Sequence, residues 1–167
     1  MRKIRIEKVT LNIGVGQPGD KLEKAMKLLK NITDRKPVQT KTMKRIPTWG
    51  LRPNLPIGCK VTLRGDLAEK ILNRLLKSRG NILPNSKFDN LGNFSFGIPE
   101  YIDIPDVEYD PDIGIIGLEV AVNLVRPGYR IKLRKIKKAK IPQRNRITKE
   151  EALEFIKEKF NTKIEEE

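Results

Sequence analysis

The sequence predicts an α+β fold in which helices cover one face of an antiparallel, or mixed, sheet and leave the other face open. Two observations support this. Three segments carry apolar side chains at helical spacing, and three others alternate apolar and polar residues with a period of two. Strands with one apolar and one polar face form sheets that are covered on one side only. We therefore expect two layers and an open, polar side.

Each expected helix opens with a residue that can cap it, followed three positions later by glutamate, which is the pattern of a capping box. The three pairs are Asp20 with Glu23, Asp66 with Glu69, and Thr148 with Glu151. The last helix is expected over 148–161, and the final IEEE is expected to be a solvated acidic end.

The alternating runs predict which side chains face outward. Leu11, Val61 and Val120 belong to the apolar sets that face the core. The intervening residues point to the open face; they are Thr10, Asn12, Lys60, Thr62 and Arg64, with Glu119, Ala121 and Asn123 in the last run. The single cysteine, Cys59, falls in an apolar set, so we expect a small packed hydrophobe and no disulfide framework.

The turn GVGQPG, residues 14–19, matches the G-x-G-x-x-G pattern of dinucleotide-binding units. Such units continue into a buried apolar strand. The chain instead continues with TDRKPVQTKTMKR, which is polar and contains Pro37, so it cannot be the central strand of a parallel sheet. We interpret the glycines as a turn from strand to helix and expect no nucleotide cofactor.

The charge points to a polyanionic partner. The 167 residues carry Lys+Arg 35 against Asp+Glu 21, a formal net charge of +14. Basic residues dominate 34–65 and 126–146, and acidic residues dominate 88–125. No apolar stretch approaches a membrane-spanning length, so nucleic acid is favoured over a membrane surface. The start MRKIRIEK lacks the apolar core of a signal peptide, and we expect a cytoplasmic protein.

The motifs that the chain lacks indicate which kind of nucleic acid it binds. It has no zinc ligands, heptad zipper or basic recognition helix, which disfavours the usual readers of the DNA major groove. Phe94 and Phe96 alternate as a base-stacking pair would, but they lie in the acidic stretch and are interpreted as core or turn residues. The interpretation that remains is that the protein recognises folded RNA by its shape.

The segment 41–58, KTMKRIPTWGLRPNLPIG, is expected to be a long functional loop. Its Lys44, Arg45 and Arg52 are expected to touch phosphates. In one interpretation Trp49 packs on the core and anchors the loop, in the other the loop is a projecting arm, and the two interpretations are compatible.

The alternative function is a metal-dependent RNA nuclease. In EYIDIPDVEYDPD, residues 100–112, five carboxylates could hold Mg²⁺ near a phosphate; they are Asp103, Asp106, Glu108, Asp110 and Asp112. Against this, the run has no lysine and the chain has no histidine. An acidic surface for a basic protein neighbour is the favoured interpretation.

Five stretches occur in the order found in one protein family: VTLNIGVG, RKPVQTK, PIGCKVTLRG, GNFSFGI with YIDIPDVEYD, and GLEVAV. In these motifs nearly the whole chain resembles the universal large-ribosomal-subunit proteins that bind 5S rRNA, conventionally numbered five. RPGYRIKLRK with NRITKEEALEF is similar to the archaeal and eukaryotic branch. The resemblance implies a non-catalytic protein of the large subunit that helps attach 5S rRNA in the central protuberance and needs no cofactor.

The resemblance also implies binding residues. The family's asparagine and threonine contacts to 5S rRNA fall on Asn12 and Thr62, and its glutamine position falls on Arg35, which could replace an amide hydrogen bond with a phosphate contact. GVGQPG resembles the family's glycine turn beside the RNA. The family's extended loop falls on 41–58 and is expected to reach the P-site tRNA.

The expected sites combine both lines of reasoning over one RNA-binding domain, 1–167. For 5S rRNA they are Thr10, Asn12, Gly14, Gly16, Arg35, Lys60, Thr62 and Arg64. For tRNA they are Lys41, Lys44, Arg45, Trp49 and Arg52. For other large-subunit rRNA they are Arg126, Arg130, Lys132, Arg134 and Lys135. Neighbouring ribosomal proteins, including one in the small-subunit head, are expected partners. We expect the protein to bind no metal and no membrane.

Overall fold

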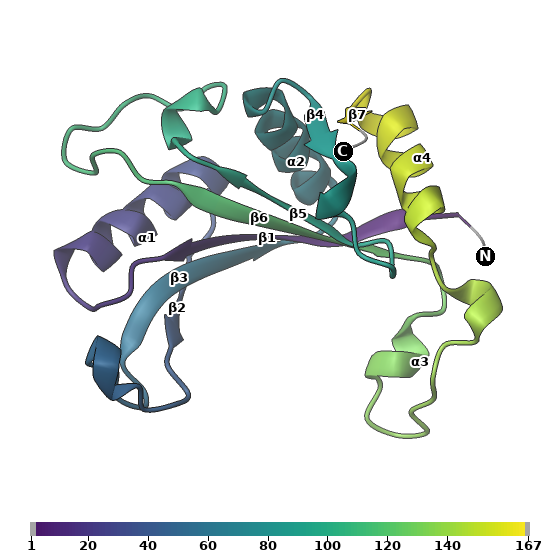
Figure 1. Ribbon diagram of the computed structural model, residues 1–167, viewed down its shortest axis with the longest axis horizontal. Coiled ribbons are helices and arrows are strands. Elements are labelled where there is room, and N and C mark those ends of the chain that lie inside the picture. Colours follow the sequence, from purple (N-terminus) through teal and green to yellow (C-terminus); the bar gives the residue numbers. More distant parts are fainter. Residues whose placement is uncertain (1–2, 166–167) are drawn as a thin grey trace.

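The computed structural model describes residues 3–165 and confirms the α+β class (Figure 1). Its main sheet has five strands in the order β2-β3-β1-β6-β5, and each neighbouring pair is antiparallel. The strands are β1 (Arg5–Gly14), β2 (Val38–Lys41), β3 (Pro56–Leu63), β5 (Phe94–Ile98) and β6 (Leu118–Val125). The helices are α1 (Asp20–Thr33), α2 (Asp66–Ser78), α3 (Arg130–Leu133) and α4 (Lys149–Phe160). No helix of the described part of the chain has the length and apolar character needed to cross a membrane.

The two faces of the sheet follow the period-two alternation. Leu11, Val61 and Val120 are buried in one cluster with the apolar side chains of α1 and α2, which lie on one side of the sheet in Figure 1. On the opposite face Lys60 and Thr62 are exposed. The inward and outward positions in these three strands therefore agree with the prediction.

Two further core predictions are confirmed. Cys59 is fully buried as a free thiol, and this burial raises its pKa to about 11. Phe94 and Phe96 are buried and stack in a row with Phe88, with ring centroids 5.0 and 6.4 Å apart. These aromatic rings stabilise the core and do not face solvent.

The first two expected capping boxes do not form. Asp20 and Asp66 are the first residues of α1 and α2, and the caps are Gly19 and Gly65, with φ of 124° and 65°. The turns that lead from strand to helix need positive φ at these positions, which glycine adopts without a side-chain clash. The two acids still lie in the first turn, where the helix dipole favours negative charge.

The GVGQPG segment is a turn between β1 and α1. The N–H groups of Val15 and Gly16 both donate to the carbonyl of Ile57, at 2.9 and 2.8 Å, so the fold itself uses backbone donors that a phosphate would need. β3 also lies between β1 and β2, whereas a dinucleotide-binding unit has adjacent parallel strands. The geometry is that of the predicted strand-to-helix turn.

The C-terminal end differs from the prediction. Lys163–Glu165 forms β7, which pairs in parallel with β4 (Ile82–Pro84) in a separate two-stranded sheet. Ile164 is half-buried there, so the prediction that this end is wholly solvated was wrong, although Glu165 is exposed. A strand of three residues is too short to show a period in the sequence. Glu166 and Glu167 lie outside the described residues.

Two basic segments extend from the sheet on the side opposite α1 and α2. Figure 1 shows the connection from β2 to β3 at one end and the chain around α3 at the other. The open face of the sheet therefore lies between two projections.

Candidate nucleic-acid interface

A groove on the open face runs beside β3. Pairing between β2 and β3 begins at Val38, because the preceding Pro37 has no N–H to donate. The residues before it leave a gap beside the last residues of β3. The polar side chains that line this gap are Arg35, Lys36, Lys60, Thr62 and Arg64. Four of the residues expected to bind 5S rRNA thus meet in one place, although Arg35 is distant from the others in sequence.

The sequence reasoning missed Lys36, which also lines this groove. The signal was present, since Lys36 follows Arg35 directly and precedes Pro37. Pro37 is buried, which fixes the chain next to the groove.

Polar side chains continue from the groove across β1. In the register between β1 and β3, Thr10 lies opposite Thr62 and Asn12 lies opposite Lys60. On the other side of β1, Asn12 Nδ2 donates to Glu119 Oε2 over 3.3 Å. An amide has one acceptor and two donors, so the oxygen of Asn12 and its second N–H remain for a ligand. The contact from Glu119 was not foreseen, because cross-strand partners depend on register.

The cations of the groove have little internal compensation. Among the ion pairs within residues 3–165, one involves a groove cation, and it joins Arg64 Nη1 to Glu7 Oε1 at 3.4 Å. Exposed pairs of this kind stabilise by about 1 kcal/mol at most, so a phosphate can compete for Arg64. The groove is therefore suited to a polyanion.

The two glycines expected at the RNA have different roles. Gly14 is exposed at the end of β1, and a Cβ there would meet nothing within 4 Å. Gly16 has φ of +85°, a conformation that is strained for other residues. Gly16 thus shapes the turn, whereas Gly14 leaves the backbone accessible at the edge of the open face.

The loop is shorter than expected and has structure of its own. It covers 42–55, since Lys41 ends β2 and Pro56 begins β3. Ile46 and Leu51 exchange two backbone hydrogen bonds of 3.0 Å around a 3₁₀ turn at Pro47–Trp49. The N–H of the buried Thr42 donates to Leu55 over 2.9 Å. Hydrogen bonds local to the loop therefore hold it in shape.

Trp49 does not anchor this loop. Its side chain is 74% exposed, so the interpretation that it packs on the core is wrong, and the buried anchor is Leu51. Met43 is exposed as well. The end of β2 and the loop also present a set of exposed cations that make no ion pair within residues 3–165; they are Lys41, Lys44, Arg45 and Arg52.

The second projection contains α3. Four residues expected to bind other rRNA are exposed there: Arg130, Lys132, Arg134 and Lys135. The guanidinium of Arg134 donates from Nε to the carbonyl of Lys137 over 2.6 Å, which orders its side chain. This projection is therefore a second cationic surface.

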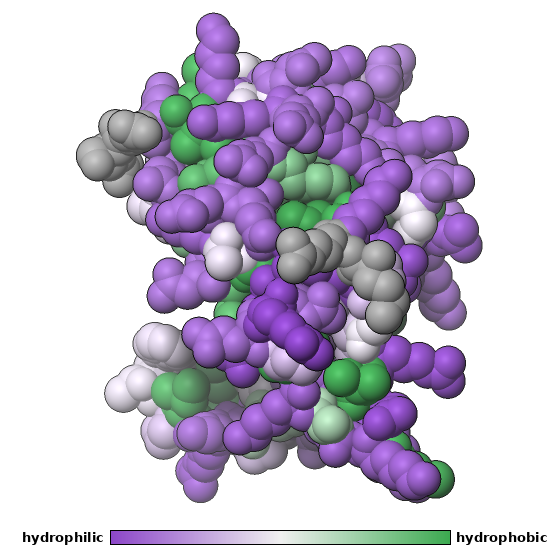
Figure 2. Space-filling view, turned by 90° about the vertical axis from the view of Figure 1, so that its right-hand side faces the viewer, coloured by the Kyte–Doolittle hydropathy of each residue, from purple (hydrophilic) through white to green (hydrophobic). Residues whose placement is uncertain are grey.

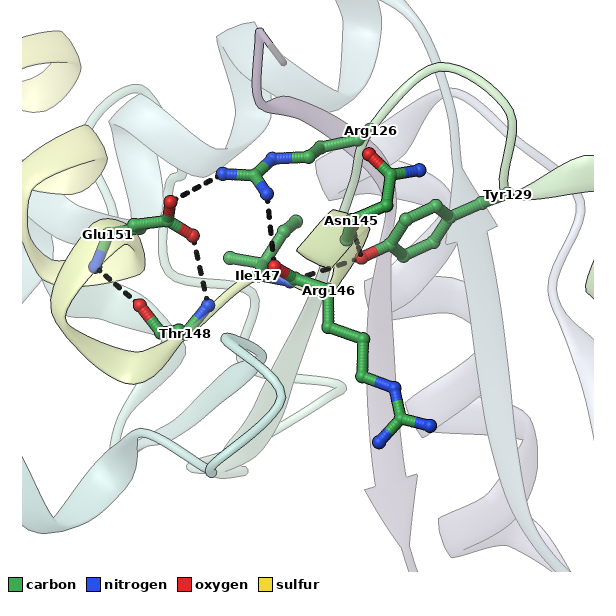
Figure 3. A network of polar contacts seen from close by, with 7 residues as sticks. All are labelled: Arg126, Tyr129, Asn145, Arg146, Ile147, Thr148 and Glu151. Carbon is green, nitrogen blue, oxygen red and sulfur yellow. Dashed lines mark hydrogen bonds and ion pairs between the residues drawn. The ribbon is translucent and has the colours of Figure 1, made fainter. Parts of the chain in front are cut away.

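Arg126 was also expected to bind rRNA, but the structure buries it (Figure 3). Its Nη2 lies 2.6 Å from Glu151 Oε1, and its Nη1 donates to the carbonyl of Arg146 over 3.0 Å. Glu151 also accepts from the N–H of Thr148 over 3.1 Å in the predicted capping box, which is confirmed. The Thr148 hydrogen bond and, second, the Arg126 guanidinium lower the pKa of Glu151. Arg126 thus joins the basic segment to α4 and is not free for a phosphate.

Tyr129 completes this connection (Figure 3). Its hydroxyl donates to the carbonyl of Asn145 over 3.0 Å and accepts from the N–H of Ile147 over 3.2 Å. The two ends of the basic segment are therefore joined to each other and to α4. We call the Arg126–Glu151 ion pair, together with the hydrogen bonds that Arg126, Tyr129 and Glu151 make to residues 145–148, the clamp.

The acidic stretch binds to the helices of its own chain. Asp110 lies 2.8 Å from Lys27 of α1, and this hydrogen bond lowers the pKa of Asp110 and raises that of Lys27. Asp106 lies 3.7 Å from Arg74 of α2, which also donates to the carbonyl of Pro105 over 2.8 Å. Within residues 3–165, no three side chains of His, Cys, Asp or Glu form a group that could hold a metal ion. The nuclease alternative has no support in this arrangement.

Comparisons with family models and with known proteins all indicate the same protein family. Residues 1–52 match the family described as ribosomal protein L5, and residues 56–160 match the model of the C-terminus of the same ribosomal family. The chain is 53% identical to large ribosomal subunit protein uL5 of Sulfurisphaera tokodaii over 99% of this chain and 94% of that protein. For the protein of the same name from Nanoarchaeum equitans the identity is 54%, over 98% and 97% of the two chains. For that of Methanosphaera stadtmanae it is 51%, over 99% and 98%.

These matches define a structural protein of the large ribosomal subunit and not an enzyme. The chain belongs to the uL5 family, and its similar relatives are archaeal. Ribosomal RNA and ribosomal proteins are therefore its partners, and its role is in translation.

Proposed function

We propose that the protein binds 5S rRNA through the open face of its sheet and helps attach this RNA to the large subunit in the central protuberance. The observation that carries the proposal is the groove beside β3, which three expected cations line together with Thr62. Phosphate contacts supply affinity and position, while hydroxyl and amide groups read the shape and the 2′-hydroxyls of folded RNA. The residues assigned to 5S rRNA are Thr10, Asn12, Gly14, Gly16, Arg35, Lys60, Thr62 and Arg64.

The two projections extend this interface. We assign Lys41, Lys44, Arg45, Trp49 and Arg52 to contact with the P-site tRNA. The exposure of Trp49 supports this, because a tryptophan at a loop tip gives a flat surface for stacking. We assign Arg130, Lys132, Arg134 and Lys135 to other large-subunit rRNA, and we withdraw Arg126.

The whole chain acts in this proposal as one RNA-binding domain. Side chains from Ile6 to Phe160 share a single buried cluster, which supports that interpretation. The acidic stretch supplies a surface for basic ribosomal neighbours, including one in the small-subunit head, since Asp103 and Glu108 are exposed and make no ion pair within residues 3–165.

The experiment is a salt series for binding of 5S rRNA to Lys60→Glu. Each lost phosphate contact lowers the slope of log affinity against log salt by about one unit. We expect weaker binding and a flatter slope. The matched control is Lys70→Glu, which makes the same charge change at an exposed lysine of α2. If the two variants lose affinity equally, net charge alone explains the effect and the groove is not the interface.

A further inference from the structure

A second concave site lies at the base of the basic segment and shares no lining residue with the groove beside β3. It encloses about 660 Å³ between the ends of β1 and β6 and the chain from residue 129 to residue 147. Pockets of about 300–1,000 Å³ are the usual size for small-molecule ligands. The clamp holds its walls in place, because Tyr129 lines the pocket and is fixed through its hydroxyl.

Apolar side chains line two sides of this pocket. Leu133 of α3 is 70% exposed and Leu91 before β5 is 52% exposed, and the buried Ile141 also lines the pocket. Figure 2 looks at the end of the molecule that carries α3 and α4, and shows hydrophobic side chains among hydrophilic ones in its lower part. Large apolar side chains that solvent reaches at a concave site indicate that a ligand covers them.

The rim of the pocket is cationic. Lys132, Lys138 and Lys140 line it, and none of them belongs to an ion pair within residues 3–165. The acid in the lining, Glu7, already faces Arg64. This charge favours a ligand that carries phosphate over an apolar protein segment.

A fixed amide lies in the same pocket. Asn123 Nδ2 donates to Asn93 Oδ1 over 3.2 Å, and Asn93 Nδ2 donates to Asp89 Oδ2 over 2.9 Å. This chain of hydrogen bonds sets the orientation of Asn123, so its oxygen and its second N–H form an acceptor and donor pair. Such a pair matches the edge of a base, as in the bidentate contact of asparagine with adenine.

We propose that this pocket holds one unstacked nucleotide of RNA. The base lies against Leu91 and Leu133, its edge meets Asn123, and its phosphate lies at the lysines of the rim. Proteins that read RNA sequence hydrogen-bond the edges of unstacked bases, and proteins that hold an extruded base place aromatic or apolar side chains against its face. The inference rests on the proposed RNA-binding function and adds a base-reading site to an interface otherwise built for shape and charge.

The test compares Leu133→Glu with Ile136→Glu. Both residues are exposed on the same segment, so both variants should fold, but Ile136 does not line the pocket. The probes are a fluorescent pentamer of riboadenylate and an abasic ribose-phosphate chain of the same length. Because Leu133→Glu removes apolar contact with the base while Ile136→Glu makes the same charge change away from it, we expect Leu133→Glu to bind the adenylate at least about fivefold more weakly than Ile136→Glu does. The abasic chain should not distinguish the two variants.

A second variant checks the base edge. Asn123→Leu removes the acceptor and donor pair and should reduce the preference for the adenylate over the abasic chain, while the apolar contact of the base with Leu91 and Leu133 remains. Equal losses for Leu133→Glu and Ile136→Glu, equal binding of the two probes to the unmodified protein, or no binding of the adenylate would each overturn the inference. The 5S rRNA series with Lys60→Glu is independent of these results, so a failure of the pocket leaves the proposed function standing.

Discussion

Replacing Glu151 with alanine should destabilise the protein, because the clamp depends on this carboxylate. The change removes an ion pair of 2.6 Å to Arg126, whose side chain is 6% exposed, and one hydrogen bond of the capping box. Breaking a buried pair costs about 3–5 kcal/mol because it strands a buried charge. Glu151 is 39% exposed, so solvent screens the pair, and we reduce the expected loss to about 2–3 kcal/mol.

Urea unfolding followed by circular dichroism measures this loss, with Glu154→Ala as the control. Glu154 is exposed on the same helix, and surface substitutions of this kind stay within about 0.5 kcal/mol. The double variant Arg126→Met with Glu151→Ala should be no less stable than Glu151→Ala, because it removes the stranded charge. If Glu151→Ala loses no more free energy of unfolding than Glu154→Ala, Arg126 is not held as we describe, and its assignment to rRNA returns.

Two further predictions concern pH and the loop. The folded pKa of Glu151 lies below its ordinary value of 4.5, so the stability it contributes is present above that value and is lost as pH falls through the folded pKa. The difference in unfolding free energy between the unmodified protein and Glu151→Ala should therefore be constant near pH 7 and shrink below pH 4.5; a difference independent of pH contradicts this. In the loop, Leu51→Ala should speed amide hydrogen exchange at Ile46, whereas Trp49→Ala should not, since Leu51 is 7% and Trp49 74% exposed. Equal exchange in the two variants would show that Leu51 is not the anchor.

Much of the fold could be predicted because local patterns determine it. Alternation placed Thr62 and Lys60 on the open face, and register in the structure pairs them with Thr10 and Asn12. The capping box at Thr148 also formed as expected. The caps of α1 and α2 could not be predicted from side chains, because the backbone angles of the preceding turns favoured glycine over a hydrogen-bonding cap.

The predictions that were wrong concern contacts between residues that are distant in the sequence. A run of basic residues does not reveal that Arg126 meets Glu151 of α4 and is buried. Of the two interpretations of the tryptophan, the one in which it anchors the loop is wrong, because the loop buries Leu51 instead. The pocket beside Asn123 likewise joins residues 7, 91–93 and 123–147, which no local pattern connects.

The most direct test of the central claim is the affinity of the protein for 5S rRNA and for an unrelated folded RNA of similar length, each across a salt series. We predict a preference for 5S rRNA that persists as salt rises, because hydrogen bonds are screened less than phosphate contacts. In the double variant Asn12→Ala with Thr62→Ala the preference should fall while the salt slope stays the same. Equal affinities and equal slopes for the two RNAs would contradict the account, because the open face would then read charge alone.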